Sequence, residues 1–319
     1  MNLFYIFCDS IQEGLWFKNL DPHLANAELL IIPNRVADQI QYGINSVLMY
    51  DRPDIILKED NEIIFVLERT IEVPSGHNVG QRFGRLVAAA KARIPVVYFG
   101  PYAAYKHGGA TAGPRYMNLR LFYSLANVAR FYDTAVTTIN WPVDAHYEVI
   151  KRPEKDARII EYLRLFFSHY DAHKMDGMAR FIADSTFQQE QVAEQQRFAA
   201  TEITNPEQYD VPPDSVEIIS SAAYERTYGT LPATVDRTKD VLIYHVGMNY
   251  IRSDPYTGMA ALYYYLYTAE RNLTQILHFP NITQAQWRVQ NARSKTYRMF
   301  KEFCDGILFS DGLVMHRNL

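Results

Sequence analysis

The stretch RPDIILKEDNEIIFVLERTIEVPSGHNVGQRFGR, residues 52–85, constrains the fold more than any other part of the chain. It predicts a strand from Pro53 to Leu57, a polar turn over 58–61 and a second strand from Glu62 to Val73. The residues 74–76 would end that strand, and a helix over 79–93 and a buried strand over 95–99 follow. Strand, strand, helix and strand in this order predict an α/β fold, a mixed central sheet flanked by helices.

Acidic residues gather at the ends of the two strands. Alternate side chains of a strand share a face, so Glu68, Thr70 and Glu72 are expected on one face and Arg69 on the other. Asp54 begins the adjoining strand. Carboxylates are costly to bury without compensation, so we expect a cation or water beside them.

Charge along the chain is segregated, although the net charge is only -4. Residues 73–131 contain no Asp or Glu, and they hold eight Lys or Arg residues. A second acid-free window, 271–301, is also rich in Lys and Arg. Such segregation is typical of a face that binds a polyanion. Chance clustering on a solvated surface is the alternative.

The composition indicates a globular protein in which 48% of the residues are hydrophobic. No apolar run approaches the roughly 20 residues of a membrane span, so no membrane part is expected. The two cysteines lie far apart, and the N-terminus has no basic lead, so we expect a cytoplasmic protein. We expect an α/β core over 1–150 and a mainly helical C-terminal part over 151–319 that completes the core.

Further elements are predicted from apolar periodicity and from Pro and Gly positions. Helices are expected over 34–50, 116–132, 154–204 (in two pieces broken near Asp171) and 283–303. Strands are expected over 137–143 and from 241 onward, with a helix that begins near Asp254. Residues 205–239 read as an extended connection, and a short apolar tail ends the chain.

Asp54, followed 13 residues later by Glu68-Arg69-Thr70, resembles the signature of the PD-(D/E)XK nuclease superfamily. The resemblance covers about residues 35–100 and implies a restriction-endonuclease-like core. It implies that Asp54 and Glu68 hold Mg2+, with help from the carbonyl of residue 69, for phosphodiester hydrolysis. Without that resemblance, Asp54 would be a turn residue, and Glu68 and Glu72 would pair with Arg69 or Arg82.

The chain departs from the signature at Thr70, where the family has a lysine. Known members tolerate Glu or Gln at that position or move the basic residue to a nearby helix. The candidates here are Gln81, Arg82 and Arg85 on the helix that follows, with His77 just before it. Glu72 is expected to bind the metal, to position its water or to act as a base, and these alternatives stay open. The catalytic set implied by the resemblance is Asp54, Glu68, Thr70, Glu72 and Gln81.

Candidate DNA-binding residues lie in the basic windows and at a predicted helix start. Arg and Lys contact phosphates or guanine edges, and a helix start presents backbone amides. Ordinary helix capping by Asp254, and plain loop roles for Lys106 and Arg115, are the alternatives. The full set is His77, Asn78, Arg82, Arg85, Lys106, Arg115, Arg252 and Asp254.

These observations together predict a Mg2+-dependent endonuclease that cuts double-stranded DNA, of the type II restriction kind. Two alternatives stay open: a catalytically inactive DNA-binding protein on the same fold, and a defence nuclease acting on RNA or single strands. A homodimer would suit a palindromic site, since two-fold symmetry of the protein matches that of the DNA.

Overall fold

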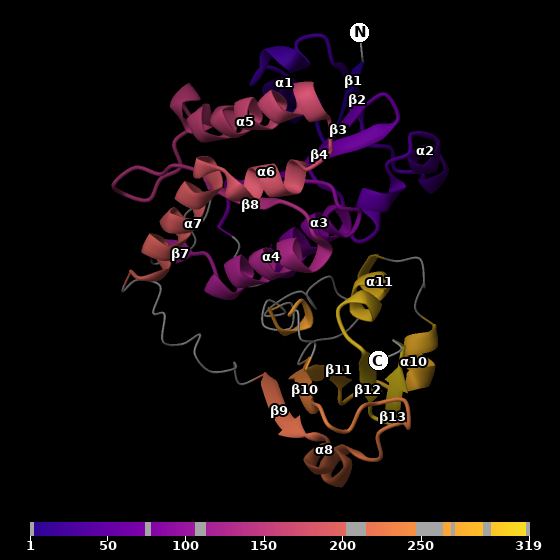
Figure 1. Ribbon diagram of the computed structural model, residues 1–319. Helices are drawn as coiled ribbons and strands as arrows, with labels where there is room; N and C mark the ends of the chain where they lie inside the picture. Colours follow the sequence, from indigo (N-terminus) through magenta and orange to yellow (C-terminus); the bar gives the residue numbers. More distant parts are fainter. Residues whose placement is uncertain are drawn as a thin grey trace.

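The computed structural model describes residues 3–73, 78–105, 113–201, 215–246, 264–268, 272–289 and 295–316. For residues 78–82 and 295–296 it describes the backbone only. The predicted α/β class is confirmed: a six-stranded mixed sheet lies among helices, and a further five-stranded sheet follows (Figure 1). No helix within these ranges is long and apolar enough to cross a membrane.

The first sheet has the strand order β2-β1-β3-β4-β5-β8. Its strands β1 and β3, and β3 and β4, pair antiparallel, whereas β1 and β2, β4 and β5, and β5 and β8 pair parallel. The strands are β1 Phe4–Cys8, β2 Glu28–Ile31, β3 Ile55–Glu59, β4 Glu62–Arg69, β5 Val96–Gly100 and β8 Val136–Asn140.

The hairpin β3–β4 and the crossover helix form as predicted, with shifted bounds. The turn is tighter than expected, and Asp60 adopts a positive φ of 49°, which a short polar side chain tolerates. The second strand ends at Arg69 rather than Val73, and the helix α3 covers Asn78–Lys91. Residues 64–67 of β4 are fully buried because both faces of this strand are covered.

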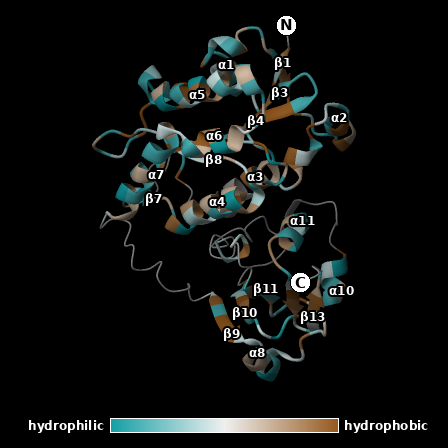
Figure 2. Ribbon diagram, viewed as in Figure 1, coloured by the Kyte–Doolittle hydropathy of each residue, from teal (hydrophilic) through white to brown (hydrophobic). Residues whose placement is uncertain are grey.

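Two groups of helices cover the two faces of the first sheet. Helices α3 and α4 share one hydrophobic core with strand residues such as Ile56 and Val66. Helices α1, α5, α6 and α7 share the other core with residues such as Ile55 and Leu67. Figure 2 shows β4 in hydrophobic colour between helices of mixed hydropathy. The bounds are α1 Ile11–Lys18, α4 Leu119–Tyr132, α5 Ala157–His173, α6 Met178–Asp184 and α7 Thr186–Ala199.

Shorter elements connect these parts. The helix expected over 34–50 is split into α2 and a 3₁₀ turn. The long helical stretch after 154 breaks after His173, close to the expected Asp171, and it breaks a second time at Ser185, between α6 and α7. These elements are α2 Val36–Gln41, the 3₁₀ turns η1 Pro22–Leu24, η2 Asn45–Leu48 and η3 Pro153–Asp156, and the two-stranded ribbon β6 Ala103–Ala104 and β7 Arg115–Tyr116.

The second sheet has the order β13-β12-β11-β10-β9 and lies wholly in the C-terminal part. One face joins the core of α3 and α4 through residues such as Leu242 and Leu277, and α8 covers the other. Its elements are β9 Val216–Ser220, α8 Ser221–Tyr228, β10 Asp240–His245, β11 Leu273–Phe279, α10 Gln284–Arg288, α11 Lys295–Glu302, β12 Gly306–Phe309 and β13 Gly312–Met315.

The prediction of an extended connection over 205–239 is wrong for residues 216–228, which form β9 and α8. Ser220 caps α8 by accepting from the amide of Ala223, a start signal hidden among nearby prolines. The strand β11 was not predicted, and the apolar tail folds into the hairpin β12–β13. The single basic helix expected over 283–303 is instead two helices, α10 and α11.

Candidate functional site

Asp54 and Glu68 lie opposite each other at one end of the hairpin. The antiparallel register pairs Ile55 with Leu67, which brings the residue before β3 beside the one after Leu67 on β4. The backbone amide of Arg69 donates to Asp54 Oδ2 at 2.6 Å, and the Asp54 carbonyl accepts from the amide of Asp9 at 3.0 Å. These bonds fix the Asp54 carboxylate at the strand end.

Arg85 of α3 joins both carboxylates from the helix side. Its Nη1 donates to Glu68 Oε1 at 2.8 Å and lies 3.9 Å from Asp54 Oδ1. Its Nε lies 3.5 Å from Asp51 Oδ2. The Glu68 side chain is 0% exposed and that of Arg85 21%. We call Asp51, Asp54, Glu68 and Arg85 the Arg85 cluster.

Burial and charge shift the pKa values of this cluster. Burial, and next the Glu68 carboxylate, raises the pKa of Asp54 to about 8, although the Arg69 amide lowers it. Burial alone would lower the pKa of Arg85, but Glu68, Asp51 and Asp54 outweigh it and raise that pKa. A buried carboxylate is costly without a countercharge, and the guanidinium supplies it.

Arg69 points away from the Arg85 cluster, as strand alternation predicts. Its guanidinium lies 4.4 Å from the ring centroid of Trp16 and 5.0 Å from that of Trp141. Burial lowers the pKa of Arg69. The side chains of Glu68 and Arg69 therefore lie on opposite faces of the sheet.

Thr70 and Glu72 depart from the expected arrangement because β4 ends before them. The Thr70 hydroxyl donates to the Glu72 carbonyl at 3.2 Å and accepts from the Glu72 amide at 3.0 Å. The two residues thus form a local turn after the strand. The expectation that Glu72 continues the strand face of Glu68 is wrong for this reason.

The other predicted site residues stand as follows. Asn78, Gln81 and Arg82 lie in the first turns of α3, whose side chains are not among those described. Arg115 is on the ribbon strand β7, where it pairs with Ala104 of β6. His77, Lys106, Arg252 and Asp254 lie outside the described residues.

A cavity of about 420 Å³ opens beside the Arg85 cluster. Arg85 lines it together with charged residues that the sequence interpretation did not single out: Asp9, Asp51, Arg52 and Arg298. Arg52 donates to Asp9 Oδ1 at 3.2 Å and to Asn34 Oδ1 at 2.6 Å. The position of Asp51-Arg52 next to Pro53-Asp54, and that of Arg298 in the second acid-free window, were the available signals.

Three arginines in one cavity suit a phosphate group, because guanidinium groups bind its oxygens through paired hydrogen bonds. Arg52 and Arg85 come from the first sheet and its helix, and Arg298 comes from α11 of the second unit. Arg298 is exposed and forms no ion pair with the described residues. Both sheet units therefore contribute charge to this cavity.

The two carboxylates of Asp54 and Glu68 are suitable ligands for Mg2+. Mg2+ is commonly held by one or two carboxylates together with water and phosphate oxygens, and Asp54 and Glu68 converge on one point. That point is the Nη1 of Arg85. Within the described ranges, no group of three or more His, Cys, Asp or Glu residues is arranged to hold a metal ion.

A second polar cluster, unpredicted from the sequence, lies on the second sheet. His245 and His278 are register partners on β10 and β11, and their Nδ1 atoms lie 2.9 Å apart. Glu217 Oε2 lies 3.5 Å from His245 Nε2 and accepts from the Tyr228 hydroxyl at 2.7 Å. Because one Nδ1 must accept, at least one ring is neutral. We call these four residues the histidine cluster.

No protein-family model, no curated protein and no solved structure matches the chain.

Proposed function

We propose that this protein is a Mg2+-dependent endonuclease that hydrolyses phosphodiester bonds in double-stranded DNA, of the type II restriction kind. The observation that carries the proposal is the convergence of Asp54 and Glu68 on one guanidinium nitrogen, at 3.9 and 2.8 Å. Two carboxylates buried at adjoining strand ends are costly for stability alone, which favours a functional role.

The fold and the neighbouring cavity support the same proposal. The order β3, β4, α3 and β5 agrees with the core implied by the PD-(D/E)XK resemblance. The cavity beside Asp51 and Arg85 brings Arg52 and Arg298 to a place where a DNA phosphate would approach the carboxylates. This combination of acids and arginines suits phosphodiester chemistry.

The chain's own residues would divide the work as follows. Asp54 and Glu68 would hold the metal, and Arg85 would offset negative charge that develops on the phosphate, in place of the missing lysine. Arg52 and Arg298 would orient the phosphate. Mg2+, when bound, polarises the phosphate and lowers the pKa of the attacking water.

Plasmid cleavage in Mg2+ and in EDTA tests the proposal. Glu68→Gln and Asp54→Asn are expected to lose about 100-fold or more of the Mg2+-dependent rate, because each removes a charged ligand oxygen. Glu217→Gln, on the second sheet, is the matched control and should cut at the wild-type rate. If both acid variants cut at the wild-type rate, the assignment of Asp54 and Glu68 as metal ligands is wrong. RNA and single-stranded DNA in parallel reactions test the substrate class.

A second candidate function is DNA binding without cleavage. The 2.8 Å ion pair between Arg85 and Glu68 favours it, because a guanidinium stands where the metal would lie, and Thr70 supplies no charge. This candidate expects binding of duplex DNA that weakens steeply with salt, with no Mg2+-dependent products. The plasmid assay and a salt titration of binding separate the two candidates.

The proposal includes a cytoplasmic location and a homodimer on palindromic sites. A dimer would give two copies of the Asp54–Glu68 site related by the two-fold axis of the DNA. Sedimentation of the protein with a palindromic duplex and with a non-palindromic one tests this part.

A further inference from the structure

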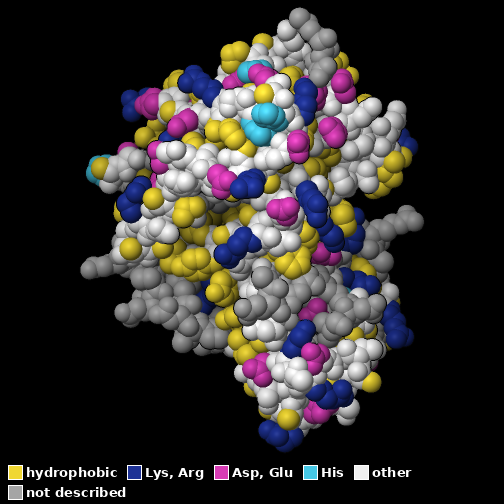
Figure 3. Space-filling model, in the orientation of Figure 1, with side chains coloured by type: hydrophobic (Ala, Val, Ile, Leu, Met, Phe, Trp, Pro, Cys, Tyr) yellow, Lys and Arg dark blue, Asp and Glu magenta, His cyan; other side chains and the backbone are white. Residues whose placement is uncertain are grey.

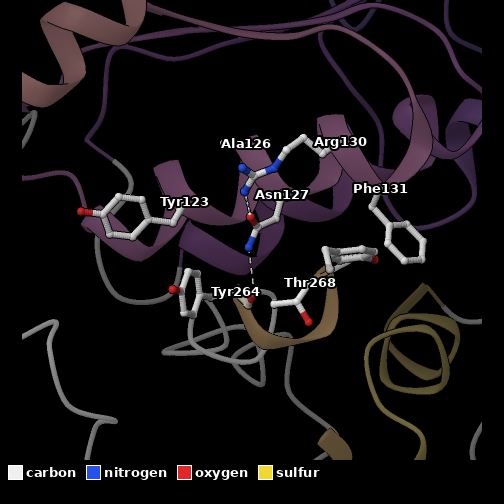
Figure 4. A pocket seen from close by; sticks show the side chains of 8 residues that line it. Tyr123, Ala126, Asn127, Arg130, Phe131, Tyr264 and Thr268 are labelled. Carbon is white, nitrogen blue, oxygen red and sulfur yellow. Dashed lines mark hydrogen bonds between the residues drawn. The ribbon is translucent and has the colours of Figure 1, made fainter. Parts of the chain in front are cut away.

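A cavity of about 690 Å³ lies between α4 and residues 264–268, away from the Arg85 cluster. Asn127 of α4 joins the two segments, since its Nδ2 donates to the Tyr264 carbonyl at 3.0 Å. Figure 4 shows this bond and the side chains around the cavity. Among the described residues, this cavity and the one beside Arg85 have separate linings.

Aromatic rings supply much of the wall. Tyr123, Tyr264, Tyr267 and Phe131 all line the cavity. Tyr267 is buried against Phe83 and Phe131 and belongs to the core. Tyr123 is 46% exposed and Tyr264 partly so, with ring centroids 6.0 Å apart. These two tyrosines therefore present ring surface to a ligand.

The charge of the wall has one sign. None of the lining residues within the described part of the chain is acidic, and Arg130 is an exposed cation at the edge of the cavity. Arg130 donates to Asn127 Oδ1, and a guanidinium has five N–H donors, so one such bond leaves donors for a ligand. In Figure 3, hydrophobic side chains with Lys or Arg among them gather at the level of α4.

We propose that this cavity binds a nucleotide, with its base against Tyr123 and Tyr264 and its phosphate at Arg130. Aromatic rings stack on any base, and the guanidinium of Arg130 complements a single phosphate. The volume lies within the range of small-molecule sites. The proposal goes beyond the cleavage reaction and does not depend on it.

Two sources of such a ligand share this chemistry: a free mononucleotide and an unpaired nucleotide within a strand. Calorimetric titration of the full chain in EDTA distinguishes them, because no cleavage occurs under that condition. The probes are nucleoside 5′-monophosphates, the matching nucleosides, inorganic phosphate and a short single-stranded oligonucleotide. A monophosphate that binds at least about tenfold tighter than nucleoside or phosphate supports the free source. Binding of the oligonucleotide alone supports the strand source.

Variants assign the binding to this cavity. Tyr123→Ala and Tyr264→Ala should each weaken it by roughly 5- to 150-fold, the range for one base stacked on one ring. Tyr123→Phe and Tyr264→Phe keep the ring and should bind as wild type. Arg130→Gln should lower the affinity for a monophosphate to about the affinity for the matching nucleoside. Arg180→Gln, an exposed arginine on α6, is the matched control.

The two proposals fail in different ways. Asp54→Asn combined with Glu68→Gln, which abolishes cleavage under the proposed function, should leave nucleotide binding unchanged. If none of the probes binds, or if the tyrosine-to-alanine and Arg130 variants bind as tightly as wild type, the nucleotide site is wrong whatever the outcome of the cleavage assay.

Discussion

Basic side chains at the two sheets have opposite surroundings. In the Arg85 cluster a guanidinium faces three carboxylates, of which Glu68 is fully buried. In the histidine cluster two imidazoles face each other, and one half-exposed carboxylate lies at the outer nitrogen. The first cluster requires a countercharge, because no solvent reaches Glu68 to stabilise its carboxylate. The second needs at least one neutral ring.

This difference shows why polar residues alone do not mark a functional site. The histidine cluster satisfies its own hydrogen bonds on a half-exposed sheet face, at little cost. The Arg85 cluster holds three acids on one cation next to an open cavity, an arrangement that stability alone does not favour. For this reason the proposed function is assigned to the first sheet and not to the second.

Arg85→Met should have the largest effect on stability. It leaves Glu68 buried without its guanidinium, and removal of one partner of a buried pair costs about 3–5 kcal/mol. Urea denaturation at pH 7 measures the change. Arg180→Met is the control, since its ion pair with Asp184 is exposed and should cost less than about 1 kcal/mol.

Adding Glu68→Gln to Arg85→Met should restore part of the loss, because the fully buried charge of Glu68 is then removed together with its countercharge. A cost below about 1 kcal/mol for Arg85→Met alone would mean that Glu68 is protonated or solvated, and the contrast between the two clusters would fail.

Arg69→Met should cost less, about 1–2 kcal/mol. The Arg69 guanidinium lies near the ring faces of Trp16 and Trp141, and methionine keeps part of the packing but loses the cation–π contacts. Urea denaturation followed by tryptophan fluorescence measures it, and the native spectrum should change with the environment of those two rings. A cost equal to that of Arg85→Met would show that Arg69 also balances a buried charge.

The smallest effect should be the pH dependence from His278. Burial, and then His245, lowers its pKa from the ordinary 6.5, so the unfolded chain binds the proton first as pH falls. His278 therefore costs stability as pH drops below about 6.5, and His278→Gln should flatten that loss. Urea midpoints between pH 5 and 8 measure it.

His23 serves as the opposite case on the first unit. Burial alone would lower its pKa, but Asp21 at 2.6 Å and Asp171 at 3.1 Å raise it. Its stabilisation is complete below the ordinary pKa of 6.5 and is lost as pH rises through the folded pKa. His23→Gln should remove the loss of stability that the wild type shows as pH rises above 6.5. If His23→Gln and His278→Gln changed the pH dependence of stability in the same direction, the contrast between the two histidines would be wrong.

Local sequence was enough to predict the hairpin, the crossover helix and the opposite facing of Glu68 and Arg69. Each follows from near-neighbour rules: polar turn residues at 58–61, a Pro-Gly break at 74–76 and two-residue alternation in a strand. The second sheet was not predicted, because β11 pairs with β10 and β12 across long separations that leave no local periodic signal.

By itself the sequence determined that Asp54 and Glu68 lie at the same end of one hairpin. Their direct opposition was decided by the structure, because a register shift between Leu57 and Lys58 moves the pairing by one residue. Only the tertiary structure decided that Arg85 of α3 lies beside both acids, and that Asp51 and Arg298 line the adjoining cavity. A helix residue's partner depends on how the helix rotates and packs on the sheet. That rotation is set by the whole core, including Phe303 and Tyr267 from the distant C-terminal part.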